Sequence, residues 1–321
     1  VEYKLSDATG SSDAVTFELK GGTIADGAIL KTTDIETVNV KVSSDEDVSL
    51  AQLSMASAGK TLKVNLTGDK VLTTQAVNAD VTTIDASGMG EGGAFVQKGR
   101  SATAASTYTG SDGNDTFQMK NTDDVIDGGA GTNDTLTVVK NLILGGIKVD
   151  LSKTADQVVT FNGNSNSSVQ KNFESVDLSG ITGTFGAEVT AIAGGSTITG
   201  TPNTDVITLG AGVDTVSLTG LAAGTKVDDI TGFTSASDKI GLDEGNTSDA
   251  TLANAAAVGY VFTDLTTGGQ GGGSLLPTNG QAFDITQAAA GASETDAADI
   301  FILKNGTAAG ADLSVGTDGT E

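Results

Sequence analysis

Aspartates recur at a regular spacing in two parts of the chain, and carboxylates in such an arrangement can bind a divalent cation. Within TYTGSDGNDTFQMKNTDDVIDGGAGTNDTL (107–136), Asp115 and Asp124 are nine residues apart and Asp134 follows ten residues later. Asp205 and Asp214 are again nine apart. Calcium prefers six to eight oxygen ligands, whereas zinc prefers His and Cys, and the chain contains neither residue. The pattern therefore favours Ca²⁺.

The aspartates belong to a nine-residue repeat. A cut at Gly110 gives GSDGNDTFQ, MKNTDDVID and GGAGTNDTL, with a large apolar residue two places after each aspartate. Glycines in the first half allow a tight turn, and the second half has the alternation of a short strand. Two repeats would form one coil of about 18 residues, and stacked coils would form a parallel β-solenoid around a thin apolar core.

Turns on the same edge of such a stack lie about 18 residues apart, which would place Asp115 opposite Asn133 and Asp134. Facing carboxylates repel one another, and a calcium ion bound between them would remove that repulsion and link the two turns. The segment 119–122 lacks the glycines of the repeat, and Asp205 has no acid 18 residues later. We therefore expect the principal site at Asp115 and Asp134. The alternative is a set of Asp-Gly and Asn-Gly turns without metal.

The remaining sequence favours an all-β fold. Period-two alternation predicts strands at 15–20, 36–42, 60–66, 134–139, 148–152, 174–179, 205–209 and 214–218, whereas Val48–Ser57 and Ser248–Ala257 are predicted as short helices. TYTGSDGNDTF (107–117) is similar to TITGTPNTDVI (197–207), which lies 90 residues later. We accordingly expect a β-rich module at 1–106, calcium-binding repeats at 107–139, a second module at 140–225 with degenerate repeats at 194–218, and a β-rich C-terminal segment at 226–321.

Composition excludes several classes of function. Seventeen basic residues against 41 acidic ones give a net charge of −24, which argues against nucleic acid as a partner. The absence of His and Cys removes Ser-His and Cys-His catalysis, and no pair of acids is marked out as catalytic, so we expect a protein that is not an enzyme. No apolar run approaches the roughly 20 residues of a membrane-spanning helix. The sequence begins at Val1 without a signal peptide, and we expect it to be part of a longer protein.

The nine-residue units resemble the GGxGxDxUx repeat of the RTX (repeats-in-toxin) family, the calcium-binding β-roll. The resemblance covers roughly residues 110–136 and 194–218. It implies calcium-dependent folding outside the cell after type I secretion. VDDITGFTSASDKIGL (227–242) and DIFILKNGTAAGADL (299–313) resemble segments that follow the repeats in type I-secreted proteins. The metal-site residues that the resemblance implies are Gly110, Asp112, Gly113, Asp115, Asp124, Gly128, Gly129, Gly131, Asn133, Asp134, Asp205, Gly210, Gly212 and Asp214.

The longer modules narrow the resemblance. Stretches rich in Thr, Ala and Gly, with IETVNV (35–40), TTIDASG (82–88) and FESVDLSG (173–180), resemble bacterial surface-layer (S-layer) proteins exported by type I secretion. This implies a structural subunit at the bacterial cell surface whose partners are copies of itself, with a cell-surface glycan or lipopolysaccharide held through regions outside this chain. The alternatives are an RTX adhesin, or the repeat region of a secreted polysaccharide-active enzyme or protease with an upstream catalytic domain.

Overall fold

The structure, a computed structural model, describes residues 2–4, 10–20, 28–56, 62–101, 104–218, 228–234, 237–242, 301–302 and 314–315. These residues form strands, turns and connecting segments, and no helix is present among them. Apart from one short antiparallel pair, the strand pairs for which registers are known are parallel. The predicted all-β class is therefore confirmed for the described residues. The chain divides into two compact units, which are described separately.

The first unit comprises Val1–Val139, Lys153–Val158 and Ser165–Val176. One group of neighbouring strands is β1 (Glu2–Lys4), β3 (Ile29–Thr33) and β6 (Gln52–Ala56). A second is, in spatial order, β2 (Ala14–Lys20), β4 (Thr37–Ser43), β7 (Leu62–Gly68), β9 (Val81–Met89), β11 (Thr107–Thr109), β13 (Val125–Asp127) and β19 (Gln170–Lys171). A third is β5 (Val48–Leu50), β8 (Val71–Thr74), β10 (Ala94–Gln97), β12 (Thr116–Met119), β14 (Thr135–Val138) and β20 (Ser175–Asp177).

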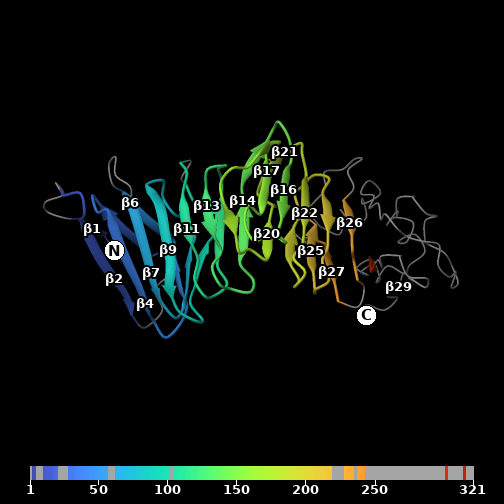
Figure 1. Cartoon of the computed structure of the whole chain (residues 1–321). Coiled ribbons are helices and arrows are strands. Elements are labelled where there is room, and N and C mark those ends of the chain that lie inside the picture. The colour runs from blue at the N-terminus through green and yellow to red at the C-terminus, as the bar shows by residue number, and fades with distance from the viewer. Residues whose placement is uncertain are drawn as a thin grey trace, which may run out of the picture. The chain divides into compact units, whose positions relative to one another are not determined.

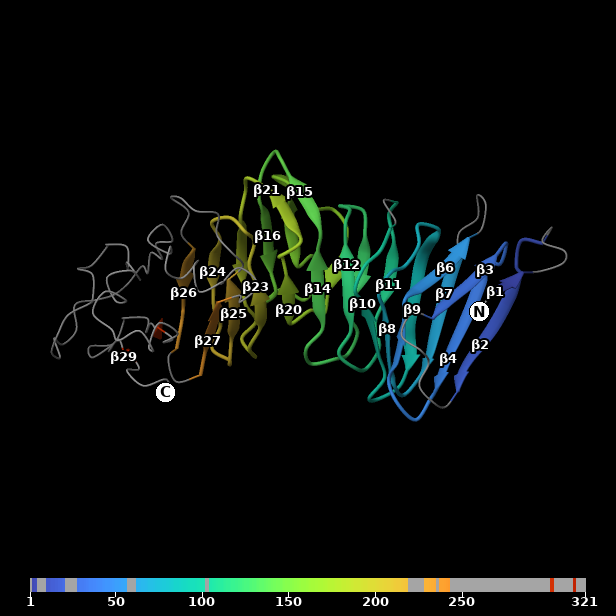
Figure 2. The ribbon, with the colours of Figure 1, turned by 180° about the vertical axis from the view of Figure 1, so that it is seen from behind.

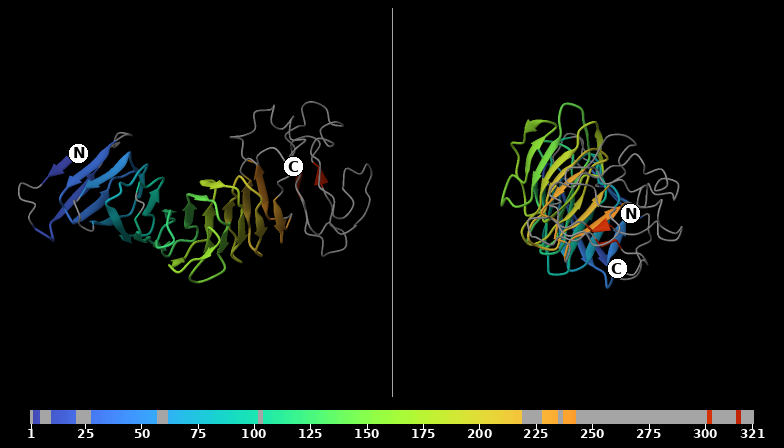
Figure 3. Two further views of the ribbon diagram at one scale, coloured as in Figure 1. Left: turned by 90° about the horizontal axis from the view of Figure 1, so that it is seen from above. Right: turned by 90° about the vertical axis from the view of Figure 1, so that its right-hand side faces the viewer.

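Successive strands from β7 to β14 alternate between the second and third groups, so each strand pairs with the next strand but one. Tyr108 is in register with Ile126, 18 residues later, and Phe117 with Leu136, 19 residues later. The strands lie side by side in Figures 1 and 3. The nine-residue repeat of the sequence thus corresponds to the number of residues from one strand to the next along the chain.

Large apolar side chains from both groups meet in the core of this unit. Phe95, Tyr108 and Phe117 are buried, and the ring centroid of Phe117 lies 5.9 Å from that of Phe95 and 5.6 Å from that of Tyr108. Ile126 and Leu136 are also buried. Burial of each such side chain stabilises a fold by roughly 1.5–3 kcal/mol. The apolar residues that follow Asp115, Asp124 and Asp134 therefore form the predicted thin core.

The second unit comprises Lys140–Ser152, Val159–Asn164 and Asp177–Glu321. β15 (Lys140–Leu142) pairs with β21 (Ile181–Gly183). A second group is, in order, β18 (Asn164–Ser165), β17 (Val158–Phe161), β16 (Ile147–Asp150), β22 (Ala187–Thr190), β24 (Val206–Thr208) and β26 (Asp229–Thr231). β23 (Thr197–Thr199), β25 (Thr215–Leu218) and β27 (Lys239–Leu242) form a third, drawn from behind in Figure 2. β28 (Phe301–Ile302) and β29 (Ser314–Val315) form the antiparallel pair.

The eight predicted strands are present, with shifts of a few residues at their ends. The predicted helix at Val48–Ser57 is wrong, because β5 and β6 lie there. β6 pairs with β3 along its whole length, and Leu53 also donates its N–H to the carbonyl of Ala76. Hydrogen bonds to chain segments on both sides of β6 thus outweigh a weak local preference for helix. The other predicted helix, Ser248–Ala257, lies outside the described residues, as does most of 299–313.

Candidate metal centre

An acidic residue stands directly before the first residue of many strands, and its carboxylate bonds to the neighbouring strand. Asp115 precedes β12, and its Oδ1 accepts the N–H of Phe95, the residue in register with it on β10. The same relation recurs before β13, β14, β20, β24, β25, β26 and β27, where the acids are Asp124, Asp134, Glu174, Asp205, Asp214, Asp228 and Asp238. Each such bond joins the start of one strand to the start of its neighbour in the sheet.

Three acids follow one another in the first unit, and we call them the first ladder: Asp115, Asp134 and Glu174. Asp134 Oδ1 accepts the N–H of Asp115 at 2.7 Å, and Glu174 Oε2 accepts the N–H of Asp134 at 2.9 Å. Asp115 Oδ2 accepts both the N–H and the hydroxyl of Ser111, each at 2.7 Å. The predicted juxtaposition of Asp115 and Asp134 is therefore present. It is made through the backbone of one residue and the carboxylate of the other.

Burial makes the charged form of the first ladder costly. The side chains of Asp115 and Asp134 are inaccessible to solvent, and Asp134 Oδ2 accepts no hydrogen bond. Burial raises the pKa of Asp134 to about 8, and the charges of Asp115 and Glu174 raise it further. Burial also raises the pKa of Asp115 and of Glu174. A cation beside Asp134 would relieve both the desolvation and the repulsion.

Glycines allow the turns beside this ladder to stack closely. A Cβ atom on Gly110 would lie 1.7 Å from the carbonyl oxygen of Gly128, and one on Gly131 would lie 2.4 Å from that of Gly113. Gly131 is also next to the ladder, since its Cβ would lie 2.6 Å from Asp134 Oδ1. Only glycine leaves room for backbone carbonyls at these positions, and such oxygens are ligands that calcium accepts.

The other predicted site residues of this block are divided between the turns and the surface. Gly129 has a φ of 114°, which favours glycine, and its Cβ would lie 2.2 Å from the carbonyl oxygen of Ser111. Asp112 and Asn133 are exposed, and Asn133 Oδ1 accepts the hydroxyl of Ser175 at 2.6 Å. Asp112 therefore lies outside the buried ladder, although it belongs to the same turn.

The second unit contains two shorter ladders, and each includes an acid that the sequence analysis did not predict as a site residue. In the second ladder, Asp228 Oδ1 accepts the N–H of Asp205 at 2.8 Å, while Asp205 itself accepts the N–H groups of Ala187 and Thr201, each at 2.7 Å. Asp228 Oδ2 is buried without a partner, like Asp134 Oδ2. Burial raises the pKa of Asp205 to about 6 and that of Asp228 to about 7.

The third ladder consists of Asp214 and Asp238. Asp214 accepts the N–H of Ser196 at 2.7 Å and that of Gly210 at 3.0 Å, and Asp238 Oδ1 accepts the N–H of Asp214 at 3.0 Å. Burial raises the pKa of Asp214, and the Asp238 charge adds to the increase. A Cβ on Gly212 would lie 2.2 Å from the backbone nitrogen of Gly195, so this turn is also closely stacked.

Asp124 is the exception among the predicted ligands. Its Oδ1 accepts the N–H of Ser106 at 2.9 Å, and its Oδ2 accepts the N–H groups of Lys120 and Asn121, each at 2.9 Å. Arg100 adds an ion pair at 3.0 Å. The surroundings of Asp124 therefore differ from those of Asp115 and Asp134, although each of the three stands two places before the large apolar residue of its repeat.

The unpaired oxygens make Asp134 and Asp228 the best candidates for holding a cation. Across the described ranges, no three side chains of the His, Cys, Asp and Glu types gather as a metal centre. A calcium ion at either ladder would therefore take many of its ligands from turn carbonyls. This donor set of few carboxylates and several carbonyls is one that calcium accepts and zinc does not prefer.

Glu174, Asp228 and Asp238 were not predicted as site residues because they do not follow at 18-residue intervals. They lie 40, 23 and 24 residues after the acids to which they bond. A different signal could have found them. Each stands directly before an alternating strand segment: SVD, DIT or KIGL.

No protein-family model, no curated protein and no solved structure matches the chain. The described residues include no helix that is long and apolar enough to cross a membrane.

Proposed function

We propose that the chain is a structural part of a secreted bacterial S-layer protein, folded as a parallel β-solenoid of the RTX type and stabilised by calcium. Calcium would bind at the first ladder through Asp115, Asp134 and the carbonyls of the Gly110–Gly113 and Gly128–Gly131 turns. A second site would lie at Asp205 and Asp228. When bound, the ion supplies positive charge between buried carboxylates and catalyses no reaction.

One observation carries this proposal: Asp134 Oδ2 is buried and unpaired, next to two further acids and two glycine turns. An ionised carboxylate in that position destabilises the folded chain when no cation is bound, so the ionised form requires a counter-charge. In the unfolded chain the same acids are far apart and solvated. Binding of a cation would therefore be coupled to folding, as secretion of an unfolded chain into a calcium-rich medium requires.

The lattice role rests on the sequence resemblance and on the composition. A net charge of −24 makes direct association of copies unfavourable without divalent cations, since they neutralise acidic surfaces. Calcium would therefore act twice, first inside the fold and then between neighbouring copies. The assembled lattice would lie on the outside of the cell.

A calcium titration tests the stabilising role. We expect circular dichroism melts of the purified chain to shift to higher temperature as free calcium rises, and to shift back when EGTA is added. The double variant Asp134→Asn/Asp228→Asn should lose most of this shift, whereas Glu188→Gln, at an exposed acid paired with Lys148 and outside every ladder, should retain it. Melting that is the same in calcium and in EGTA would reject the metal site.

A separate measurement tests the lattice. Electron microscopy of the chain at millimolar calcium should show ordered sheets that disperse in EGTA. A chain that binds calcium, stays monomeric and adheres to glycans or host cells would instead support the adhesin. Hydrolysis of a polysaccharide or protein by the full-length parent, with this chain dispensable for turnover, would support the enzyme alternative.

A further inference from the structure

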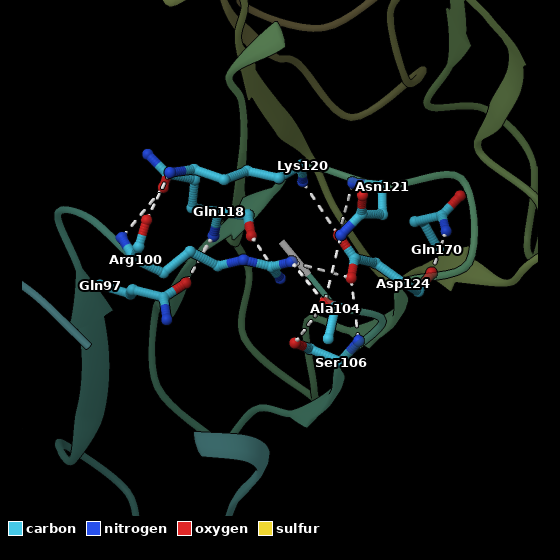
Figure 4. A network of polar contacts seen from close by, with 9 residues as sticks. All are labelled: Gln97, Arg100, Ala104, Ser106, Gln118, Lys120, Asn121, Asp124 and Gln170. Atoms are coloured by element: carbon cyan, nitrogen blue, oxygen red, sulfur yellow. Dashed lines mark hydrogen bonds and ion pairs between the residues drawn. The ribbon is translucent and has the colours of Figure 1, made fainter. Parts of the chain in front are cut away.

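The chain has a single arginine, Arg100, and its side chain is completely buried against Asp124. Figure 4 shows the contact between Arg100 and Asp124, in which Nη2 lies 3.0 Å from Oδ1. Neither side chain is accessible to solvent. Charges inside a protein are costly unless they are paired and hydrogen-bonded. Because burial of a charge is costly, the complete burial of the one arginine of this chain requires an explanation.

The guanidinium group is held on several sides. Nη1 donates to the carbonyl of Gln118 at 3.2 Å, Nη2 donates to the carbonyl of Ala104 at 3.3 Å, and the group lies 5.5 Å from the centre of the Tyr108 ring. The backbone N–H of Arg100 donates to Gln118 Oε1 at 3.0 Å. A planar cation with directed donors can make these contacts together, whereas the ammonium group of lysine cannot.

Asp124 and Asp134 differ in what surrounds their carboxylates. Both oxygens of Asp124 accept backbone N–H groups, and the guanidinium adds a full positive charge. Asp134 has one unpaired oxygen, and its other oxygen accepts the backbone N–H of Asp115. Both aspartates stand directly before a strand of the first unit. The difference between them therefore lies in the source of the counter-charge.

We infer that Arg100 is a built-in counter-ion that takes at Asp124 the place that calcium would take at the first and second ladders, so the segment after β10 is held to the starts of β11 and β13 without calcium. The part of this inference that compares Asp124 with metal sites rests on the proposed function. The ion pair joins the segment after β10 to the start of β13 and also fixes the carbonyl of Ala104, before β11. It would provide a metal-independent clamp in a fold that otherwise depends on calcium.

A double-mutant cycle tests the ion pair in the whole chain, in EGTA. Removal of one partner of a buried pair leaves an uncompensated charge, so Arg100→Met and Asp124→Asn should each lower the melting temperature, by roughly 10 °C for Arg100→Met. The double variant should lose no more than the worse single variant. Arg100→Lys should not restore the wild-type value. Additive losses, or a silent Arg100→Met, would overturn the inference.

Hydrogen exchange of the wild-type chain tests the same inference without relying on a variant that folds. The amides of Ser106, Lys120 and Asn121, which donate to Asp124, should exchange at the same rate in calcium and in EGTA. The amides of Asp115 and Asp205 should exchange about tenfold faster in EGTA. Faster exchange of the Asp124 donors in EGTA would overturn the inference. If neither set responds, the calcium proposal fails, and the mutant cycle alone decides the role of Arg100.

Discussion

The backbone N–H of Asp205 donates to Oδ1 of Asp228 at 2.8 Å although the two residues are 23 positions apart. Asp115 donates in the same way to Asp134, 19 positions later, at 2.7 Å. In both pairs the residues are in register at the start of neighbouring parallel strands. Membership of a ladder is therefore decided by strand register, and the number of residues in the intervening loop is free to vary.

The stability of the metal-free chain should fall as pH rises. The pKa of Asp134 is about 8 and that of Asp228 about 7, against 3.8 for an ordinary aspartate. Between about pH 4 and pH 8 the folded state keeps protons that the unfolded state has lost, so the free energy of unfolding decreases with pH. Urea denaturation in EGTA at pH 5, 6, 7 and 8 should show this decrease. Asp134→Asn/Asp228→Asn should flatten it, and an increase with pH in the wild type would contradict the assignment.

Two substitutions at Asp134 should have different effects in EGTA. Asp134→Ala removes the acceptor for the Asp115 N–H and leaves that buried donor unpaired, which should cost about 1–3 kcal/mol. Asp134→Asn can keep an oxygen for this N–H and removes the buried charge, so it should be close to wild type or more stable. Urea midpoints measure both. Calcium should stabilise neither variant as much as the wild type, and equal stabilisation of all three would place the ion elsewhere.

A methyl group at Gly131 should disrupt the stacked turns. The added Cβ would lie 2.4 Å from a backbone carbonyl oxygen, which cannot move without its strand, so Gly131→Ala should destabilise the fold by about 1–3 kcal/mol. The matched control is Gly90→Ala, because no atom outside residues 89–91 lies within 4 Å of the Cβ position at Gly90. This control should change stability by less than about 0.5 kcal/mol. Thermal melts of the two variants side by side would distinguish a packing requirement from a general effect of losing glycine.

Asp228 should matter to the second unit as Asp134 does to the first. In EGTA, Asp228→Ala should expose the Asp205 amide, and its exchange with deuterium should be faster than in the wild type because the carboxylate that accepts this N–H is removed. The control is Glu188→Gln, at an exposed acid paired with Lys148 on the outer face of β22. If the Asp205 amide stays protected in Asp228→Ala, the second ladder does not hold β24 and β26 together.

The local pattern of the sequence was enough to predict eight of the strands and the contact between Asp115 and Asp134. Alternation of apolar and polar residues defines strands because side chains point to opposite faces of a sheet. The nine-residue spacing then placed Phe117, Ile126 and Leu136 in one core, and Asp115 beside Asp134. These predictions succeeded because successive strands here are joined by short turns of nearly constant length.

The partners of the remaining acids depended on the tertiary structure. Glu174 bonds to Asp134 although it lies 40 residues later, because two of the segments between them, 140–152 and 159–164, belong to the other unit. The helix predicted at Val48–Ser57 failed for a related reason, since strands distant in sequence supply the hydrogen bonds that make β5 and β6. No local pattern contains this information.

Arg100 shows the same division most clearly. The sequence alone determined that Asp115, Asp124 and Asp134 each stand two places before the apolar residue of a repeat, because that relation depends only on spacing. Only the tertiary structure decided that a guanidinium 24 residues before Asp124 is buried against it, while an oxygen of Asp134 is left unpaired. Local sequence repeats the carboxylate, but the counter-charge of each carboxylate comes from whatever the packed neighbouring strands place beside it.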